Sequence, residues 1–349
     1  MKRQLSAFEY LREKARKTDT LLSLHFDITY RCPLRCIHCY IDHRRMQELS
    51  LNEIDRILHN ARTLNVLFVT YSGGEVFLRK DFEKILRITK RLGFSIKIIT
   101  SGYLIKEREV EILRENDVLN VGVSLYSLDP SIHDSITQVR GSFEKTMNAI
   151  ELLYRNNINI IIKTSIMRGN YSNYIDILKW TKKFNGKIIA QYDMVITPTM
   201  SKRGGVRELN IPFEEKKRLF KEIGRIEKIK EVKIDEMESE RQASINKDAV
   251  TCYAGITGLY IAPDGKLFPC VEWNELLGDL RRESLIDIWR NSEKLRWIKS
   301  LRITDYKQCF SCKYLGVCSI CPGLNLRDTD NIFKPSELAC QRARMYYEN

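Results

Sequence analysis

The sequence lacks several features that would place it in a broad class at once. In 349 residues it has no uninterrupted apolar run approaching the ~18 residues of a membrane span, and no apolar segment follows its basic N-terminus. We therefore expect neither a membrane span nor a secretory signal. The chain has no internal repeat and no low-complexity tract, so no repeat architecture is expected.

The sequence also lacks the basic blocks of a nucleic-acid-binding protein. Its formal net charge is +13, but its 58 lysines and arginines are spread along the chain among 45 acidic residues. It has no block of Lys and Arg alone and no RNA-binding signature beside aromatic residues. We expect no nucleic-acid partner, and a field that mildly attracts an anionic ligand or an acidic peptide.

What is present is a core-forming composition and many cysteines. Hydrophobic residues make up 43% and charged residues 30% of the chain, as in a globular protein of two domains or of one large domain with an appendage. Ten cysteines in a chain without a secretory signal favour metal ligation over disulfides, because reducing compartments keep thiols available. We therefore predict a cytoplasmic metalloprotein.

The most informative stretch is a compact cysteine triplet. Cys32, Cys36 and Cys39 are spaced C-x3-C-x2-C directly after a run that alternates like a β-strand. Thiolates are soft ligands that suit iron–sulfur clusters or zinc. Three protein ligands on a four-iron cluster leave one iron open, which suggests chemistry. The alternatives are a zinc loop or unrelated buried cysteines.

From Leu21 onward the chain alternates strand-like and helical segments. A capping box at Ser50-Leu-Asn-Glu53 opens one helix, and Asp81, Ser142 and Ser172 are expected to open three more. Serial βα units predict a parallel sheet, and both an open six-unit barrel and a doubly wound sheet satisfy the pattern. The strand-like segments are Leu22–Thr29, Val66–Ser72, Ser95–Thr100, Leu119–Leu125, Ile158–Ile166 and Ile188–Val195.

All the remaining cysteines lie in the last hundred residues. Two C-x2-C pairs could form a zinc ribbon, but seven thiolates do not divide into two closed four-cysteine sites. They fit one complete site and one site with an open or non-cysteine position. These seven are Cys252, Cys270, Cys309, Cys312, Cys318, Cys321 and Cys340.

The triplet, ending in His-Cys-Tyr40, resembles the signature of the radical S-adenosylmethionine (SAM) enzymes. The resemblance implies a [4Fe–4S] cluster whose open iron is chelated by SAM, and a 5′-deoxyadenosyl radical that abstracts hydrogen from a substrate. It also decides between the two architectures. We expect an α/β chain with a partial (β/α)6 radical SAM barrel, whose mouth holds the cluster after the first strand.

The same family implies further contacts with SAM. Ser72-Gly-Gly-Glu75 resembles its GGE motif, although Val76 stands where many relatives have proline. Without the cysteine triplet nearby, a Gly-Gly pair after a strand is usually only a turn, and serines at strand ends are ordinary caps. His133 and Asp134 are expected to open or cap a helix rather than to catalyse, and no catalytic acid or base can be named. The implied cofactor contacts are Tyr40, Gly73, Gly74, Glu75, Ser101 and Ser124.

The C-terminal array resembles the SPASM extension of radical SAM enzymes, which holds two auxiliary iron–sulfur clusters. The resemblance assigns Cys252, Cys270 and Cys321 to the first, leaving its fourth ligand open. It assigns Cys309, Cys312, Cys318 and Cys340 to the second. No cysteine lies between Cys252 and Cys270, and the last pair is C-x2-C rather than C-x3-C. Both features depart from the family pattern.

Four segments are therefore expected. They are a lead-in helix (1–20), a radical SAM partial barrel (21–200), a helical linker (201–250) and a small SPASM domain (251–349).

The resemblance implies an enzyme that modifies a peptide or protein by cross-linking, thioether formation or epimerisation. It implies an electron donor such as flavodoxin or ferredoxin. Val271 after Cys270 argues against sulfatase maturation, since those relatives carry aspartate there. Tetrapyrrole decarboxylation is an alternative substrate class, and a zinc-binding module without radical chemistry is a distant one.

Overall fold

The structure is a computed structural model of the chain and describes residues 7–41, 46–197, 206–227 and 247–347. Its centre is a curved sheet whose first six strands run parallel in the order β6-β5-β4-β3-β2-β1. All six predicted strands are present, with ends that shift by at most a few residues. They are β1 (Ser23–Thr29), β2 (Phe68–Gly73), β3 (Ser95–Thr100), β4 (Asn120–Ser124), β5 (Ile160–Ser165) and β6 (Ile188–Asp193).

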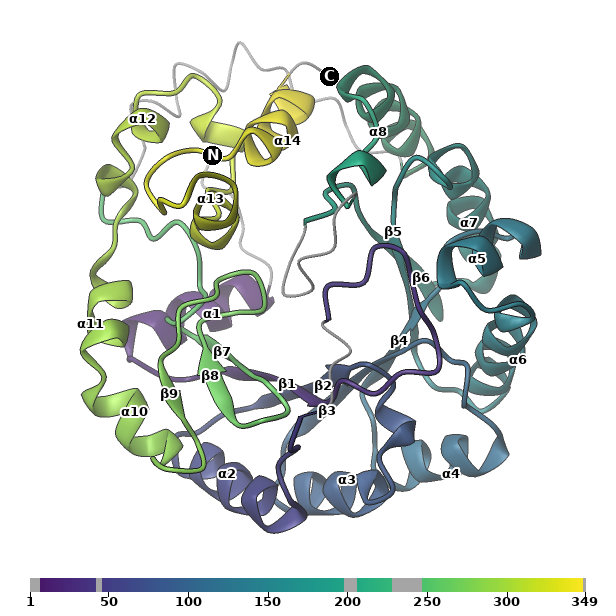
Figure 1. Cartoon of the computed structure of the whole chain (residues 1–349), viewed down its shortest axis with the longest axis horizontal. Helices are drawn as coiled ribbons and strands as arrows, with labels where there is room; N and C mark the ends of the chain where they lie inside the picture. The colour runs from purple at the N-terminus through teal and green to yellow at the C-terminus, as the bar shows by residue number, and fades with distance from the viewer. Residues whose placement is uncertain (1–6, 42–45, 198–205, 228–246, 348–349) are drawn as a thin grey trace.

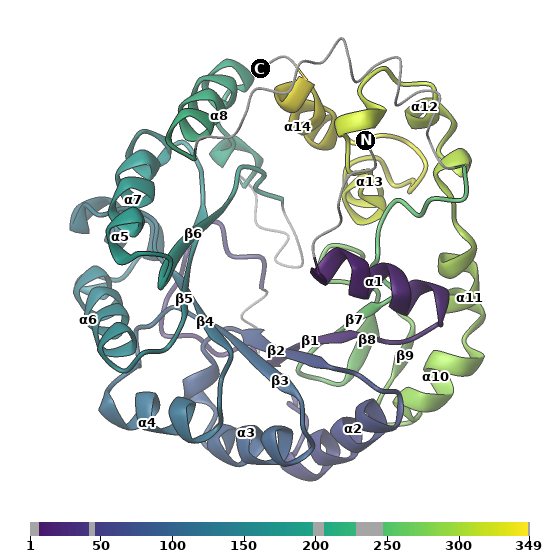
Figure 2. The same cartoon turned by 180° about the vertical axis from the view of Figure 1, so that it is seen from behind.

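Helices cover the outer, convex face of this sheet (Figure 1). We call the inner, concave face of the sheet the lumen face. The predicted partial barrel is confirmed: it is open, because the sheet does not close on itself. The helices of this half are α1 (Ala7–Lys17), α2 (Leu51–Thr63), α3 (Phe82–Arg91), α4 (Glu107–Glu115), α5 (Pro130–Thr137), α6 (Ser142–Arg155), α7 (Tyr174–Thr181) and α8 (Phe213–Glu227). Helix α1 lies on the inner side, as Figure 2 shows from behind.

Each strand turns an apolar row outward and a more polar row toward the lumen. In β3, Ile96, Ile98 and Thr100 are fully buried against the helices, whereas Lys97 and Ile99 are half-buried on the lumen face. Because side chains alternate along a strand, one strand can build the core and line the lumen at the same time.

The predicted helix starts are present, with different caps in three cases. The Ser50–Glu53 capping box closes as expected. Asp81 precedes α3, but its carboxylate pairs with Arg79 at 2.8 Å instead of capping the helix. Helix α6 begins at Ser142 and is capped by a carboxylate from α5.

The remaining start lies close to its predicted position. The segment predicted to open at Ser172 begins as the short 3₁₀ helix Tyr171–Asn173, and α7 then starts at Tyr174. Within the predicted helical linker (201–250), α8 starts just after Pro212, and residues 228–246 lie outside the described residues.

The C-terminal region continues the same sheet, which the strand pattern had not indicated. Strand β7 (Gly258–Ile261) pairs in parallel with β1, and two short antiparallel strands, β8 (Lys266–Phe268) and β9 (Gly278–Asp279), follow. This ladder joins residues of the predicted SPASM domain (251–349) to the sheet of the predicted barrel (21–200).

The last helices complete the ring of outer elements opposite α4 to α7 (Figure 1). They are α10 (Leu285–Asn291), α11 (Glu293–Ser300), α12 (Lys307–Phe310), α13 (Pro322–Thr329) and α14 (Glu337–Tyr347). No helix among the described residues has both the length and the apolarity needed to cross a bilayer.

Candidate active site and cysteine clusters

The first cysteine set (Cys32, Cys36 and Cys39) lies in the loop that follows β1. The pKa values of the Cys32 and Cys36 thiols are raised to about 12, chiefly by burial, and the charges of neighbouring cysteines contribute to that rise. Three thiolates so close together need a cationic partner, which an iron–sulfur cluster supplies. The loop therefore brings the three predicted ligands together in a setting that fits a cluster.

Helix α5 supports this loop through its backbone. The N–H groups of Arg35 and Ile37 each donate, at 3.0 Å, to carbonyl oxygens at the last turn of α5. Helix-end carbonyls lack partners within their own helix, so the loop satisfies them while it is held in place. The cysteine loop thus has a backbone anchor on each side of Cys36.

The end of β2 anchors the loop from the opposite side. The N–H of Gly74 donates to the carbonyl of Thr29 at 2.7 Å. A Cβ on Gly73 or Gly74 would stand 2.2 Å from a carbonyl oxygen of this loop, and Gly73 has a φ of +124°. The two predicted glycines are therefore needed for close backbone packing between the GGE segment and the cysteine loop.

Glu75 is completely buried and is fixed by two neighbouring residues. Its carboxylate accepts a hydrogen bond from the Thr100 hydroxyl at 2.7 Å, one from the Ser101 N–H at 3.0 Å and a short one from the Ser101 hydroxyl. Burial raises the pKa of Glu75, while these hydrogen bonds oppose the shift. The structure thus brings two predicted SAM contacts, Glu75 and Ser101, into direct contact at the ends of β2 and β3.

Ser124 lies at the end of β4, near a residue that sequence reasoning missed. The Tyr126 phenol interacts with both the Ser124 hydroxyl and the Cys36 thiol. Its ring packs edge-on against His38, with the centroids 4.9 Å apart. Tyr126 therefore links the end of β4 to the cysteine loop. The only sequence signal was its place in the strand-end segment Val-Ser-Leu-Tyr-Ser127.

His133 and Asp134 have separate roles. His133 lies inside α5, so the expectation that it opens or caps a helix is wrong: Asp129 is the N-cap. Its Nδ1 accepts the backbone N–H of Tyr126 at 3.3 Å, and burial lowers the pKa of His133 to about 4. Asp134 does cap a helix, because it accepts N–H bonds from the first turn of α6.

Tyr40 is hydrogen-bonded to a buried acid, Asp27. Its hydroxyl donates to Asp27 at 3.0 Å, and the Tyr260 hydroxyl donates to the same carboxylate oxygen at 2.8 Å. Tyr30 and Tyr260 share a further hydrogen bond of 2.7 Å. Sequence reasoning missed Asp27, although a lone acid in an apolar strand is a signal. This network ties the cysteine loop to β7.

The second cysteine set (Cys252, Cys270 and Cys321) comes from three separate segments. The pKa of Cys270 is raised to about 12, chiefly by burial, and the charges of Cys252 and Cys321 contribute to that rise. Arg327 donates at 2.6 Å to each of the two carbonyls that follow Cys270 and so fixes that stretch. Three thiols thus meet without a fourth cysteine, as the sequence pattern predicts.

Glu272 is a further residue that sequence reasoning missed near this set. Burial raises its pKa, its carboxylate accepts the Thr197 hydroxyl at 3.2 Å, and its charge reaches Cys321. Glu272 stands two residues after Cys270, and this spacing alone does not indicate a functional residue.

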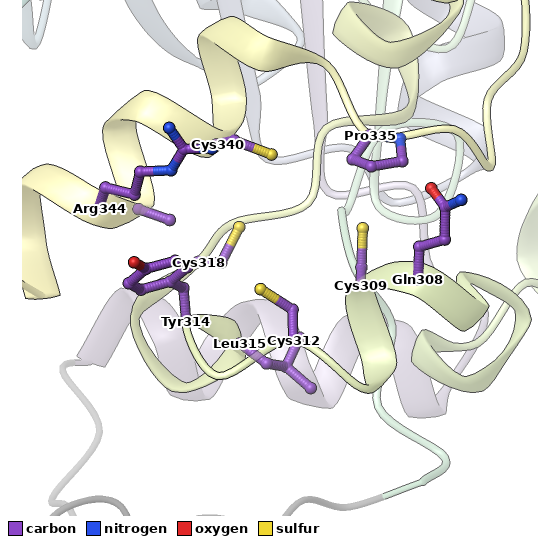
Figure 3. Close-up of a pocket in the computed structure, with 10 residues that line it drawn as sticks. Gln308, Cys309, Cys312, Tyr314, Leu315, Cys318, Pro335, Cys340 and Arg344 are labelled. Carbon is purple, nitrogen blue, oxygen red and sulfur yellow. The ribbon is translucent and has the colours of Figure 1, made fainter. Parts of the chain in front are cut away.

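The third cysteine set surrounds a cavity of about 130 Å³ (Figure 3). Cys309 and Cys312 come from the segment around α12, Cys318 follows a short 3₁₀ turn, and Cys340 projects from α14. Residues 309 to 318 form a loop that α14 closes from the other side. The four predicted ligands are thereby collected around one space.

The cavity of the third set has a lining that suits a cluster. Four thiols border it, and its largely apolar wall suits a buried inorganic core.

Comparisons with known proteins agree with this chemistry. The family model of the radical SAM superfamily matches residues 26–184, and that of the SPASM iron–sulfur cluster-binding domain matches residues 252–313. The first match contains Cys32, Cys36 and Cys39. The second contains Cys252, Cys270, Cys309 and Cys312, whereas Cys318, Cys321 and Cys340 lie beyond its end.

Two curated relatives match most of the chain. The antilisterial bacteriocin subtilosin biosynthesis protein AlbA of Bacillus subtilis is 27% identical over 86% of this chain and 67% of its own length. An AdoMet-dependent heme synthase of Methanosarcina barkeri is 24% identical over 85% of this chain and 89% of its own length.

The crystal structure of Streptococcus suis SuiB shares the fold. It has a TM-score of 0.72 and 19% identity, and the alignment covers 97% of this chain and 83% of SuiB. Radical SAM enzymes use SAM with a [4Fe–4S] cluster, and SPASM domains bind auxiliary iron–sulfur clusters. The chain is a radical SAM superfamily enzyme with a C-terminal SPASM domain.

Proposed function

We propose that this enzyme abstracts hydrogen from a peptide or protein substrate and so installs a cross-link, a thioether or an inverted stereocentre. The observation that carries the proposal is the match to AlbA, whose name assigns it to the biosynthesis of a bacteriocin. That match spans 86% of this chain and is therefore not confined to the barrel.

The residues of each cysteine set fit the group that we assign to it. The first set would hold the SAM-binding cluster, and the second and third sets would hold the auxiliary clusters. When bound, the first cluster and SAM supply a 5′-deoxyadenosyl radical. The proposed SAM contacts are Tyr40, Gly73, Gly74, Glu75, Ser101 and Ser124.

The chain's own contribution is orientation. The hydroxyls of Thr100 and Ser101 hold the Glu75 carboxylate, and the Gly74 N–H holds the backbone of the cysteine loop. Because these groups are buried and mutually bonded, they keep their places without reorganisation when a ligand enters. For Tyr40, whose hydroxyl is bonded to Asp27, we propose support of the loop and contact with SAM through its ring.

Decarboxylation of a tetrapyrrole is the second candidate. A specific observation favours it: the match to the Methanosarcina barkeri heme synthase covers 89% of that protein, against 67% of AlbA. The two candidates differ in substrate but share the cluster and SAM chemistry.

The test uses anaerobically reconstituted enzyme with dithionite and SAM. A library of short acidic peptides is supplied in one arm and an iron-bound tetracarboxylate porphyrin in the other. 5′-Deoxyadenosine is assayed, and products are analysed by mass spectrometry in deuterated buffer. We expect peptides that lose two hydrogens or gain deuterium. Loss of carbon dioxide from the porphyrin, with unchanged peptides, would overturn the proposal.

Two variants and a metal analysis accompany this experiment. Glu75→Gln should lower 5′-deoxyadenosine formation by roughly tenfold to a hundredfold, since an amide cannot accept all the bonds of a buried carboxylate. Glu111→Gln, an exposed change on α4, should leave it unchanged. Zinc in place of iron and sulfide would exclude radical chemistry altogether.

We further propose an electron donor such as flavodoxin or ferredoxin and a cytoplasmic location. The ten cysteines, none of which forms a disulfide in the described part of the chain, support that location. The lack of a nucleic-acid partner stays a prediction from the charge pattern.

A further inference from the structure

Two lysines project from the lumen face of the barrel. Lys97 on β3 stands beside Thr70 in the sheet register, and Lys163 on β5 stands between Ser124 and Gln191. Both belong to the inward rows of their strands and are half-buried. A buried parallel sheet normally carries apolar side chains at such positions, so two ammonium groups need a reason to be there.

Lys97 is held by aromatic faces rather than by an acid. Its ammonium nitrogen lies 4.8 Å from the ring centroid of Phe68 and 5.6 Å from that of Phe8 on α1. Burial lowers the pKa of Lys97, yet cation–π contact favours its charged form. The side chain is therefore positioned with its charge uncompensated.

Lys163 is positioned by a glycine and an amide. A Cβ on Gly122 would meet the aliphatic stem of Lys163 at 3.4 Å, so the glycine leaves room for this stem to lie across β4. The ammonium group donates to the side-chain carbonyl of Gln191 at 2.5 Å. Burial lowers the pKa of Lys163, and the charge of Lys97 lowers it further, so the two ammonium groups are near enough to repel each other.

Neither lysine has a carboxylate partner among the described residues. The nearest lumen acid on β1, Asp27, already accepts hydrogen bonds from two tyrosines. Half-buried, repelling cations without a counter-charge are costly. Such a pair favours an anion that enters from outside the chain.

A cavity of about 380 Å³ adjoins the surroundings of Lys97, although neither lysine lines it. Its lining includes Phe8 and Thr70, which adjoin Lys97, and Cys252 and Cys270 of the second cysteine set. A ligand in this cavity would therefore lie close to the neighbours of Lys97 and against the second cysteine set.

We propose that Lys97 and Lys163 bind a carboxylate of the substrate in the barrel lumen. The inference rests on the proposed function, since it takes the lumen as the substrate site, and it narrows the substrate to an acidic one. On a peptide, the group is an Asp or Glu side chain or the C-terminal carboxylate. The same two ammonium groups would accept a porphyrin propionate, and the experiment distinguishes this ligand from a peptide carboxylate.

The test measures binding to the reconstituted holoenzyme by fluorescence anisotropy. The probes are a dye-labelled peptide of alternating Glu and Gly, its Gln-for-Glu counterpart, and a tetracarboxylate porphyrin as competitor. The variants are Lys97→Met and Lys163→Met, which keep the stem, and Lys97→Arg and Lys163→Arg, which keep the charge. Lys183→Met, on the exposed 3₁₀ turn after α7, is the matched control for net charge. Iron content and circular dichroism verify folding.

We expect the Glu peptide to bind more tightly than the Gln peptide, and each Met variant to weaken it by roughly tenfold to a hundredfold. The Arg variants should keep most of the affinity, and Lys183→Met should stay within about twofold of wild type. The Gln peptide should bind all variants equally. SAM affinity is measured in parallel.

Different failures have different meanings. Equal binding of the Glu peptide to wild type and both Met variants would overturn the lysine assignment and leave the peptide proposal standing. Lysine-dependent binding of the porphyrin alone would retain the carboxylate site and overturn the peptide substrate. Loss of SAM affinity in the Met variants with unchanged peptide binding, or no binding of any probe to wild type, would overturn the inference.

Discussion

At Gly74 the end of β2 lies against the backbone of the cysteine loop, with no room for a side chain. A Cβ there would stand 2.2 Å from the carbonyl oxygen of Arg31, and a backbone atom cannot rotate away as a side chain can. Several groups at the mouth of the barrel are fixed in this direct way. Glu75, for example, is fixed by hydroxyls from β3.

Gly74→Ala should therefore displace the cysteine loop. We expect the iron content to fall from about twelve to about eight atoms per chain, as loss of one four-iron cluster requires. 5′-Deoxyadenosine formation should be lost with it. The measurement is iron and sulfide analysis after anaerobic reconstitution.

Gly169→Ala is the control for this change, because nothing lies within 4 Å of a Cβ at that position. It should keep both the iron and the activity. Full iron content in Gly74→Ala would contradict the view that close backbone packing holds the loop.

At the scale of elements, α5 serves the active site through both its end and its interior. Its last carbonyls accept N–H groups of the cysteine loop, and His133 within it accepts the N–H of Tyr126. Tyr126 in turn contacts Cys36 and Ser124. A short helix with few exposed functional groups thus orders two segments of the mouth.

The buried imidazole of His133 should make stability depend on pH. Burial lowers its pKa from the usual 6.5 to about 4. On acidification, the unfolded chain takes up a proton on His133 at a higher pH than the folded chain does. The contribution of the neutral imidazole to stability is therefore fully present above pH 6.5 and is lost as the pH falls toward 4. Between pH 7 and 5 the loss should be about 2 kcal/mol.

Urea unfolding at the two pH values, compared between wild type and His133→Asn, measures this contribution. The variant should be less stable at pH 7 but should lose about 2 kcal/mol less on acidification. His59→Asn, at an exposed site on α2, should show the wild-type pH dependence. An unchanged dependence in His133→Asn would mean that the histidine is protonated in the folded state.

At the scale of the whole molecule, the three cysteine sets are built by different principles. The first lies in one loop, the second joins three segments that are far apart in sequence, and the third closes a loop against α14. The Asp27 network and the β1–β7 ladder couple the first set to the C-terminal region.

Because each set uses its own cysteines, a substitution in one set should remove only the cluster of that set. Cys32→Ala, Cys270→Ala and Cys309→Ala should each remove about four irons and leave about eight. Iron analysis with electron paramagnetic resonance of the reduced protein would assign each signal to one set. Loss of all iron in any single variant would show instead that the sets assemble as one unit.

Much of this architecture was predictable because it depends on local sequence. The six parallel strands follow from apolar runs, the α2 start from its capping box, and the first cysteine set from spacing within eight residues. These features need few long-range contacts, so the chain near each position contains nearly all the relevant information. The family resemblance added the open barrel and the cofactors, which periodicity alone left undecided.

Sequence alone determined the parallel α/β scaffold and the compact cysteine loop, because residue type and short spacing govern strand formation and bring three thiolates together. The family resemblance, and not the spacing, selected iron–sulfur chemistry over zinc. Tertiary structure decided how distant parts meet: β7 beside β1, Glu75 against Ser101, Tyr40 and Tyr260 on Asp27, and Lys97 near Lys163. These pairings depend on strand register and on which row faces the lumen. A shift of one residue would turn each strand's inward side chains into the core, and only the packed fold excludes that shift.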